Sequence, residues 1–290
     1  MSVMLEVSNL RKDFKDFSLK DISFSLERGY IMGFIGANGA GKTTTIKLIL
    51  NLIKKDGGNI NVFGLDNIKY EKEIKNRIGV VFDESYYYGE LTISEMKRVI
   101  APFYSNWSDS TFNKYIKDFQ LPSDRKIKEL SKGMKMKFSL AMALSHEAEL
   151  LIMDEPTSGL DPIIRSELLD ILKNVIMDEN KGIFFSTHIT SDLDKIADYV
   201  TLIDQGEIVL SDSKDQIMSD YVLVKGPKEL LNDSTRKAFI DVKENQFGFE
   251  GLSNDKQRIR NLFKDKVITE KPQLEDIMLY YTRRRKEIYV

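Results

Sequence analysis

The stretch Gly36-Ala37-Asn38-Gly39-Ala40-Gly41-Lys42-Thr43 decides the fold of this chain. It matches the phosphate-binding pattern G-x-x-x-x-G-K-[ST]. The apolar run at residues 30–35 predicts a buried strand before it, and residues 44–50 have apolar side chains at helical spacing after it. In such a unit the glycines let backbone N–H groups converge on phosphate oxygens at the positive end of a helix. The sequence therefore predicts a nucleoside triphosphate site.

Two residues of this loop have specific expected roles. Lys42 would reach the β- and γ-phosphates, and the Thr43 hydroxyl would ligate Mg²⁺. Further contacts to the nucleotide are expected from Asn38, Gly39, Gly41 and Thr44. The alternative is a glycine-rich turn that binds nothing, but the strand, the lysine, the threonine and the helix together favour the phosphate site.

A second strand supplies carboxylates. Residues 150–153 are all apolar, which predicts a central parallel strand, and Asp154 and Glu155 follow where the strand leaves the core. Asp154 would hold Mg²⁺, and Glu155 would orient or deprotonate the attacking water. An ordinary strand that ends in solvated acids would look the same. Combined with the phosphate loop, the acid pair predicts hydrolysis.

The composition limits the class of protein. The chain has 290 residues, 42% of them hydrophobic and 30% charged, and its net charge of −2 gives no general attraction to nucleic acid. It has no cysteine, which excludes disulfides and thiolate metal sites. No window approaches the roughly 20 apolar residues that a membrane-spanning helix needs. Any work at a membrane would therefore need a spanning subunit from another chain.

Alternating strand and helix signals predict a parallel α/β core with helices on both faces. Strands dominate residues 3–35, and helical signals dominate from Thr92, where Glu95 is placed for a capping box, to about residue 144. We expect a nucleotide-binding domain at residues 1–212, with a helical subdomain at about 86–145. Residues 213–290 are expected to form a small α+β accessory domain.

Five motifs together resemble the ATP-binding cassette (ABC) ATPases. They are the phosphate loop, the segment Leu130-Ser131-Lys132-Gly133-Met134 (a signature loop), the acid pair, the segment Ser158-Gly159-Leu160-Asp161 and His188 after a strand. Their order and spacing agree from residue 3 to about 210. The resemblance implies a P-loop NTPase core with a parallel sheet, an antiparallel β subdomain and a helical subdomain.

The resemblance also implies that two subunits pack head to tail, each ATP lying between one phosphate loop and the other subunit's signature loop. Asp161 would lie in the loop at that interface, and His188 would contact the γ-phosphate and assist Glu155 in catalysis. The signature residues expected to face the partner's ATP are Ser131, Lys132, Gly133 and Met134. Ser131 could equally be the N-cap of the next helix.

Phe14 lies where the family usually has an aromatic residue that stacks on adenine. A core phenylalanine is the alternative interpretation, and Phe17 is a rival for the same role. Elsewhere the chain departs from the family pattern. Asp83 occupies the place of a glutamine that contacts Mg²⁺ or water, and we expect it near the metal. Lys132 and Met134 replace a glycine and a glutamine of the common signature.

The short helical segment and the lack of zinc-binding cysteines resemble transporter ATPases. Tyr86, Tyr87, Tyr88 and Trp107 would line a groove for a membrane subunit, or else pack the helical segment against the core. The overall sequence resembles ABC-2-type exporter subunits, including those of bacterial phenol-soluble modulin exporters. The expected function is ATP- and Mg²⁺-dependent export of an amphipathic peptide or drug. A homodimer would drive it at the cytoplasmic face of the cell membrane through a separate membrane subunit.

Two alternatives remain open. One is a soluble ABC ATPase that acts on ribosomes or nucleic acid, against which the balanced charge argues. The other is a nucleotide-binding regulator without turnover, against which the presence of Glu155 argues.

Overall fold

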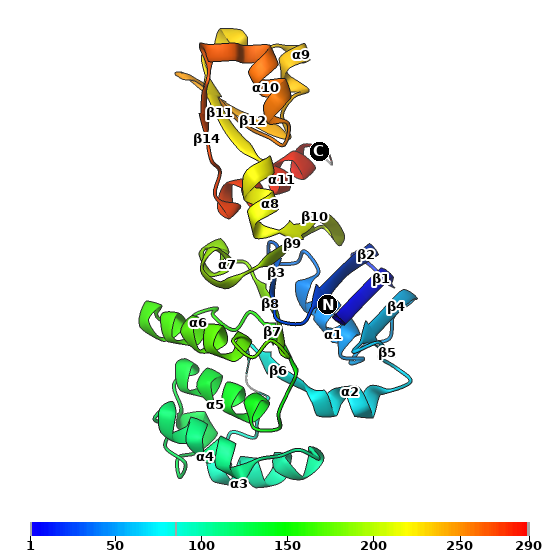
Figure 1. Cartoon of the computed structure of the whole chain (residues 1–290), viewed down its shortest axis with the longest axis vertical. Helices are drawn as coiled ribbons and strands as arrows, with labels where there is room; N and C mark the ends of the chain where they lie inside the picture. Colours follow the sequence, from blue (N-terminus) through cyan, green and yellow to red (C-terminus); the bar gives the residue numbers. More distant parts are fainter. Residues whose placement is uncertain (1, 85, 289–290) are drawn as a thin grey trace. The chain divides into compact units, whose positions relative to one another are not determined.

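The computed structural model describes residues 2–84 and 86–288 of the chain, with side chains up to Arg284. The chain forms two compact units that divide between Ile208 and Val209. The boundary expected from the sequence was at residue 212. The division falls inside strand β10 (Glu207–Ser213), which starts in the first unit and ends in the second (Figure 1).

A six-stranded sheet in the order β10-β9-β3-β8-β7-β6 forms the centre of the first unit (Figure 1). Besides β10, its strands are β9 (Tyr199–Asp204), β3 (Ile31–Ile35), β8 (Gly182–Thr187), β7 (Leu150–Asp154) and β6 (Ile78–Phe82). The pairs β9–β3, β3–β8, β8–β7 and β7–β6 are parallel. Strands β3, β7 and β8 are buried along their whole length, which explains their unbroken apolar sequences.

The register of this sheet brings the predicted motifs together. Asp154 is paired with Phe82 on one side and with Ser186 on the other, and Ile35 is paired with Thr187. The carboxyl ends of β3, β8, β7 and β6 therefore meet at one edge of the sheet. The loops that follow these strands all begin there, as expected for ligand sites in parallel sheets.

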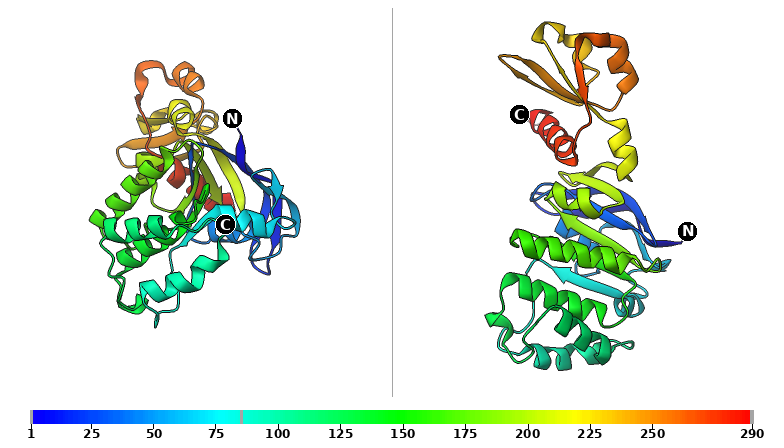
Figure 2. Two further views of the ribbon diagram at one scale, coloured as in Figure 1. Left: turned by 60° about the horizontal axis from the view of Figure 1, so that its bottom comes forward. Right: turned by 60° about the vertical axis from the view of Figure 1, so that its left-hand side comes forward.

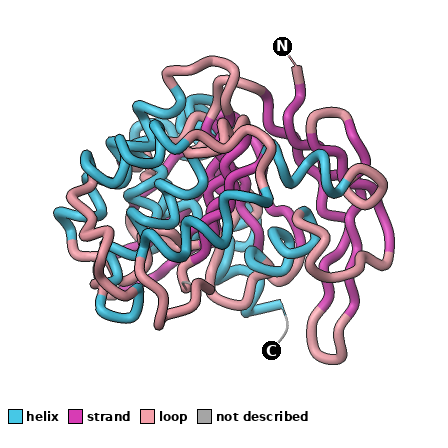
Figure 3. Tube along the Cα trace, turned by 90° about the horizontal axis from the view of Figure 1, so that it is seen from below, coloured by secondary structure: helices cyan, strands magenta, loops and turns pink. Residues whose placement is uncertain are grey.

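An antiparallel sheet with the order β2-β1-β4-β5 flanks this core. Its strands are β1 (Val3–Asp13), β2 (Ser18–Glu27), β4 (Gly57–Val62) and β5 (Leu65–Asp66). Buried and exposed residues alternate in β2, so one face of the sheet packs on the core and the other faces solvent. Figures 2 and 3 show this sheet on one side of the first unit and most of the helices on the other.

The helices of the first unit are α1 (Lys42–Ile49), α2 (Glu71–Arg77), α3 (Ile93–Ile100), α4 (Asp109–Asp118), α5 (Lys132–Leu144), α6 (Pro162–Ile176) and α7 (Thr190–Ile196), with 3₁₀ turns at Ala101–Phe103 and Ile127–Glu129. Helices α3, α4 and α5 form the predicted helical subdomain (Figure 1). The capping box at Thr92 and Glu95 is present at the start of α3, as predicted. No helix in the described part of the chain is long and apolar enough to cross a membrane.

The second unit is an α+β domain, as predicted. Its antiparallel sheet has the order β12-β13-β11-β14 and is formed by β11 (Val222–Gly226), β12 (Asp241–Asn245), β13 (Gly248–Ser253) and β14 (Ile268–Glu270). Its helices are α8 (Lys214–Asp220), α9 (Asp233–Arg236), α10 (Lys256–Phe263) and α11 (Leu274–Ile288), with 3₁₀ turns at Lys228–Leu230 and Lys264–Lys266. Val224, Phe249, Ile259 and Phe263 form the centre of its small core.

Candidate nucleotide site

The phosphate loop runs from the end of β3 to the start of α1, and two of its glycines are required by geometry. A Cβ on Gly36 would lie 2.3 Å from the Ile203 carbonyl oxygen. Gly41 has a φ of 115°, and a Cβ there would lie 2.6 Å from Leu19 Cδ2. Any larger residue at either position would force the backbone to move. The phosphate loop therefore packs closely on Ile203 and Leu19 where the chain turns into α1.

The start of α1 lacks a cap of its own. In the described structure no side chain accepts a hydrogen bond at its N-cap, Gly41, and no acidic residue lies in its first turn. Side-chain oxygens cap α3, α4, α5, α6 and α8. In the part of the chain that the structure describes, helices α2 and α7 also lack a side-chain cap, but each has an acidic residue in its first turn. The first N–H groups of a helix need acceptors, and the helix dipole favours an anion there. The start of α1 thus fits a phosphate group.

Lys42 is the charged group of this loop, and only 5% of its side chain is exposed. Its Nζ donates to the carbonyl oxygens of Gly36 at 2.7 Å and Ala37 at 3.2 Å. It also lies 3.0 Å from Glu155 Oε1. A buried ammonium needs such acceptors. Lys42 therefore links the phosphate loop to Glu155, which directly follows β7.

Glu155 lies between two partners. Its Oε1 faces Lys42, and its Oε2 lies 2.7 Å from His188 Nδ1 and accepts from the His188 backbone N–H at 3.3 Å. Because an ionised carboxylate only accepts, this arrangement requires the proton on Nδ1. Glu155 also has a φ of 51°, a strained conformation for a residue with a side chain. The structure therefore brings Lys42, Glu155 and His188 into one chain of contacts.

Ser186 is a residue that our sequence analysis missed. Its hydroxyl donates to Asp154 Oδ1 at 2.6 Å and accepts from the Glu155 backbone N–H at 3.1 Å. The same N–H contacts the Ser186 carbonyl oxygen, also at 3.1 Å. Ser186 thus positions both acids. The available signal was a hydroxyl in an otherwise apolar strand.

The predicted Mg²⁺ ligands fit a metal that is held mainly by its substrate. Asp154 is 5% exposed and hydrogen-bonded, and Thr43 lies exposed in the first turn of α1. Among the described residues, no three Asp, Glu or His side chains are close enough to hold a metal ion together. Mg²⁺ usually keeps several waters and binds one or two carboxylates plus substrate phosphates. Thr43 and Asp154 suit that mode, and their role stays a prediction.

Phe14 is not a core residue, because 46% of it is exposed. The Lys12 Nζ lies 5.6 Å from the centre of its ring. Phe17 is more buried and packs on the core, and its ring would lie 3.0 Å from a Cβ on Gly41. Phe17 therefore supports the loop, whereas the Phe14 ring is accessible. Stacking of Phe14 on adenine stays a prediction.

The predicted signature loop lies at the start of α5. Ser131 is its N-cap, and the hydroxyl accepts from the Met134 N–H at 3.2 Å, so the capping interpretation is correct. Gly133 is buried, and a Cβ there would lie 2.8 Å from Ile164 Cγ2 of α6. Within the subunit, this glycine is therefore required by the packing of α5 on α6. Ser131 and Lys132 are exposed.

The comparisons with known proteins agree with this geometry. The family model described as ABC transporter matches residues 19–158. The bacitracin transport ATP-binding protein of Bacillus licheniformis is 35% identical over 246 residues, which cover 83% of this chain and 79% of the relative. The chain belongs to the ABC transporter ATP-binding proteins.

Two further comparisons extend this assignment. A fluoroquinolones export ATP-binding protein of Mycobacterium tuberculosis is 29% identical over 281 residues, covering 92% of this chain and 88% of the relative. A solved ATP-binding subunit of an ABC transporter has a TM-score of 0.68 at 29% identity, over 74% of this chain and 92% of that structure. This ABC transporter ATP-binding protein is an ATPase, and its fold is that of the family.

Two positions that depart from the family pattern contact each other in this ABC protein. The Lys132 Nζ lies 2.5 Å from Asp83 Oδ1. Asp83 directly follows β6, and Lys132 is the first residue of α5. The Asp83 carboxylate, expected near Mg²⁺, is thus engaged by a lysine of its own subunit. Its role at the metal stays a prediction, as does that of Met134.

Asp161 also caps a helix. Its Oδ1 accepts from the N–H groups of Ile163 and Ile164, both at 3.1 Å, at the start of α6. This bond fixes the loop between the acid pair and α6. The role of Asp161 at a subunit interface stays a prediction.

The four aromatic residues that were expected to line a groove for a membrane subunit differ in their exposure and contacts. Tyr87 packs on Phe138 with ring centres 4.9 Å apart, and burial raises the pKa of its hydroxyl to about 12. The Trp107 Nε1 donates to Asp109 within the helical subdomain. Tyr86 and Tyr88 are 73% and 70% exposed. Of these four aromatic residues, Tyr86 and Tyr88 are the exposed candidates for contact with a membrane subunit.

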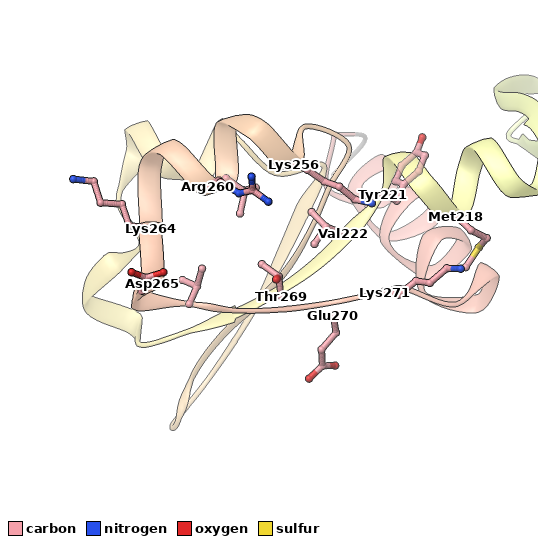
Figure 4. Close-up of a pocket in the computed structure, with 12 residues that line it drawn as sticks. Met218, Tyr221, Val222, Lys256, Arg260, Lys264, Asp265, Thr269, Glu270 and Lys271 are labelled. Atoms are coloured by element: carbon pink, nitrogen blue, oxygen red, sulfur yellow. The ribbon is translucent and has the colours of Figure 1, made fainter.

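The second unit has a pocket that our sequence analysis did not predict (Figure 4). It lies beside α10 and β14, and its lining includes Tyr221, Val222, Lys256, Arg260 and Lys271. The Lys256 Nζ donates to the Ser219 carbonyl oxygen. None of the residues predicted to handle ATP lines this pocket.

Proposed function

We propose that this ATPase powers export through a separate membrane subunit, by ATP-driven closure of a head-to-tail dimer. The observation that carries the proposal is the chain of contacts Lys42–Glu155–His188 beside an uncapped α1. A phosphate-binding helix start lies next to a carboxylate held by a lysine and a histidine. This arrangement suits hydrolysis of a terminal phosphate.

Each side chain has a distinct task in this proposal. Lys42 and the first N–H groups of α1 bind the phosphate oxygens of ATP. When the Lys42 ammonium turns to those oxygens, Glu155 Oε1 is free to accept a proton from the attacking water. His188 keeps the other oxygen in place through its Nδ1 proton. Thr43 and Asp154 would hold Mg²⁺, which would neutralise the charge that develops on the phosphates.

One subunit contains both halves of the proposed interface. Asn38 and Gly39 are exposed in the phosphate loop, and Ser131 and Lys132 are exposed at the start of α5. Two copies arranged head to tail would each place a signature loop against the other's ATP. Because no predicted residue of either half is missing from this chain, a homodimer would have two complete sites.

The names of the relatives support a proposal for the cargo and the location. By name, one relative transports bacitracin and another exports fluoroquinolones. We infer an ABC-2-type exporter for an amphipathic peptide or drug, a class that includes phenol-soluble modulins, at the cytoplasmic face of the cell membrane. Tyr86 and Tyr88 would contact the membrane subunit. If Tyr86→Ala/Tyr88→Ala retained full co-purification with that subunit, this contact would be excluded.

The test of the mechanism is Glu155→Gln. This variant should bind ATP normally and lose turnover by about 10²–10⁴-fold, the usual contribution of a general base. With ATP and Mg²⁺ it should elute as a dimer, measured by light scattering. Glu147→Gln, at an exposed carboxylate, is the control and should behave as the wild type. Turnover at the wild-type rate would refute the role of Glu155, and a monomer at saturating ATP would refute the closure model.

A further inference from the structure

The ion pair between Lys132 and Asp83 connects two parts of the proposed dimer site. Lys132 lies between Ser131 and Gly133 at the start of α5, and Asp83 lies at the edge of the central sheet. The Nζ–Oδ1 distance is 2.5 Å, and the side chains are 43% and 37% exposed. The pair therefore joins the helical subdomain to the sheet edge that carries the acid pair.

The lysine also reaches the loop before α6. A Cβ on Gly159 would lie 3.1 Å from Lys132 Nζ. Gly159 has a φ of 63°, in the left-handed region that favours glycine. One ammonium thus contacts Asp83 after β6 and lies close to Gly159 in the loop after β7. It is the charged group next to Ser131, the residue that the proposed dimer places against the partner's ATP.

We propose that Lys132 is a switch. In a single subunit its ammonium is held by Asp83, and in the closed dimer it exchanges this carboxylate for the triphosphate bound to the second subunit. The inference rests on the proposed dimer closure. Asp83 is then a positioning residue that keeps the cation away from the interface until the triphosphate arrives.

The physical chemistry favours such an exchange. A partly exposed ion pair contributes little to stability, so its opening costs little. The triphosphate carries several negative charges where Asp83 carries one, so it attracts the ammonium more strongly. Lysine has a compact charge on a flexible stem, which lets it change partners without movement of the backbone. Opening of the pair also releases the Asp83 carboxylate beside the strand end that is paired with Asp154.

Zero-length carbodiimide cross-linking tests the switch directly, because it joins a lysine to a carboxylate only in contact. Glu155→Gln protein would be treated with and without ATP and Mg²⁺, and the cross-linked peptides measured by mass spectrometry. The Lys132–Asp83 product should form without ATP and fall at least about fivefold in the dimer. The control is the Lys137–Glu167 pair, also 2.5 Å apart, which joins α5 to α6 and whose product should not change.

Light scattering on the same samples separates the possible failures. If a dimer forms and the Lys132–Asp83 product persists, the switch is wrong while the proposed function stands. Absence of the product without ATP also overturns the switch. If no dimer forms at saturating ATP, the closure model fails and the switch fails with it.

Charge-neutral variants give a second measurement. Asp83→Asn frees Lys132, so the ATP concentration that half-saturates dimer formation in the Glu155→Gln background should fall about two- to fivefold. In a chain that also carries Lys132→Gln, the Asp83→Asn change should have no further effect. Glu84→Gln removes a neighbouring exposed carboxylate and should leave the midpoint unchanged. An equal shift in the Lys132→Gln background would overturn the inference.

Discussion

Two helix starts in the first unit, those of α1 and α5, differ in how their first N–H groups are satisfied. The start of α5 is complete within the subunit, because the Ser131 hydroxyl accepts from the Met134 N–H. The start of α1 has no side-chain cap, and Lys42 beside it is buried among oxygens. The first N–H groups of α1 are left to water or a bound anion, whereas one of those of α5 is already satisfied by Ser131.

The proposed ATP site has two halves, the phosphate loop with α1 and the signature loop with α5. Because their helix starts differ, the two halves should respond differently to mutation. The α1 half is a preformed phosphate site, in which the buried Lys42 ammonium contacts Glu155. The α5 half already has a structural role, so any contact with a partner's nucleotide is an additional task of the same residues. Variants of the first half should affect binding by the single subunit, and variants of the second should affect only the dimer.

The largest effect is expected for Lys42→Ala. The variant removes the buried cation that faces the phosphates, and such truncations cost about 2–5 kcal/mol, so ATP affinity should fall at least about 100-fold. Isothermal titration with ATP and Mg²⁺ measures it. Lys47→Ala, a half-buried lysine of the same helix, is the control and should bind ATP as the wild type does. Near-normal affinity of Lys42→Ala would show that α1 alone holds the phosphates.

Ser131→Asp separates capping from nucleotide contact in the second half. Aspartate is as good an N-cap as serine and suits the helix dipole, so thermal stability should be kept. Its charge would oppose the partner's triphosphate and remove a hydroxyl donor, so turnover should fall about 100-fold. ATP binding by the single subunit should not change. Wild-type turnover would show that Ser131 only caps α5.

Phe14→Ala should have a smaller effect, confined to the first half. Stacking on a base is worth about 1–3 kcal/mol, so ATP affinity should fall about tenfold. Because Phe14 is exposed, its removal should leave the melting temperature unchanged. An equal loss of affinity for inorganic triphosphate would contradict stacking, since that ligand has no base.

The first half could be predicted from the sequence because its signals are local. Each apolar run, that of β3 and that of β7, lies within a few positions of the functional residues that follow it. Their chemistry depends on that short spacing and on the parallel order of the strands. The structure brings Lys42 into contact with Glu155 beside Asp154, and the predicted roles of these three residues stay predictions.

The contacts of the second half could not be predicted, because they join segments that are distant in sequence. The Lys132–Asp83 pair and the packing of Gly133 on Ile164 depend on where α5 lies against β6 and α6. Tyr87 is packed while Tyr86 and Tyr88 are exposed, and a loop has no period that could assign these directions in advance. Ser186 also acts across strands, through its pairing with Asp154.

The smallest expected effect is a pH dependence of stability that arises beyond the C-terminal end of α5. His146 follows this helix, and its Nε2 lies 3.0 Å from the Ile78 carbonyl oxygen of β6 while its ring stacks on Tyr104. Burial lowers the pKa of His146 from its ordinary value. Below about pH 6.5 the unfolded chain therefore binds more protons than the folded chain, and the free energy of unfolding falls as pH falls.

One proton limits that slope to about 1.4 kcal/mol per pH unit. Urea unfolding of the wild type between pH 7.5 and 5.5 should show this contribution, and His146→Gln, which cannot titrate, should lack it. His188→Gln is the matched control, because the contribution of His146 should persist when the other histidine is removed. Identical slopes for the wild type and His146→Gln would contradict a lowered pKa of His146 in the folded chain.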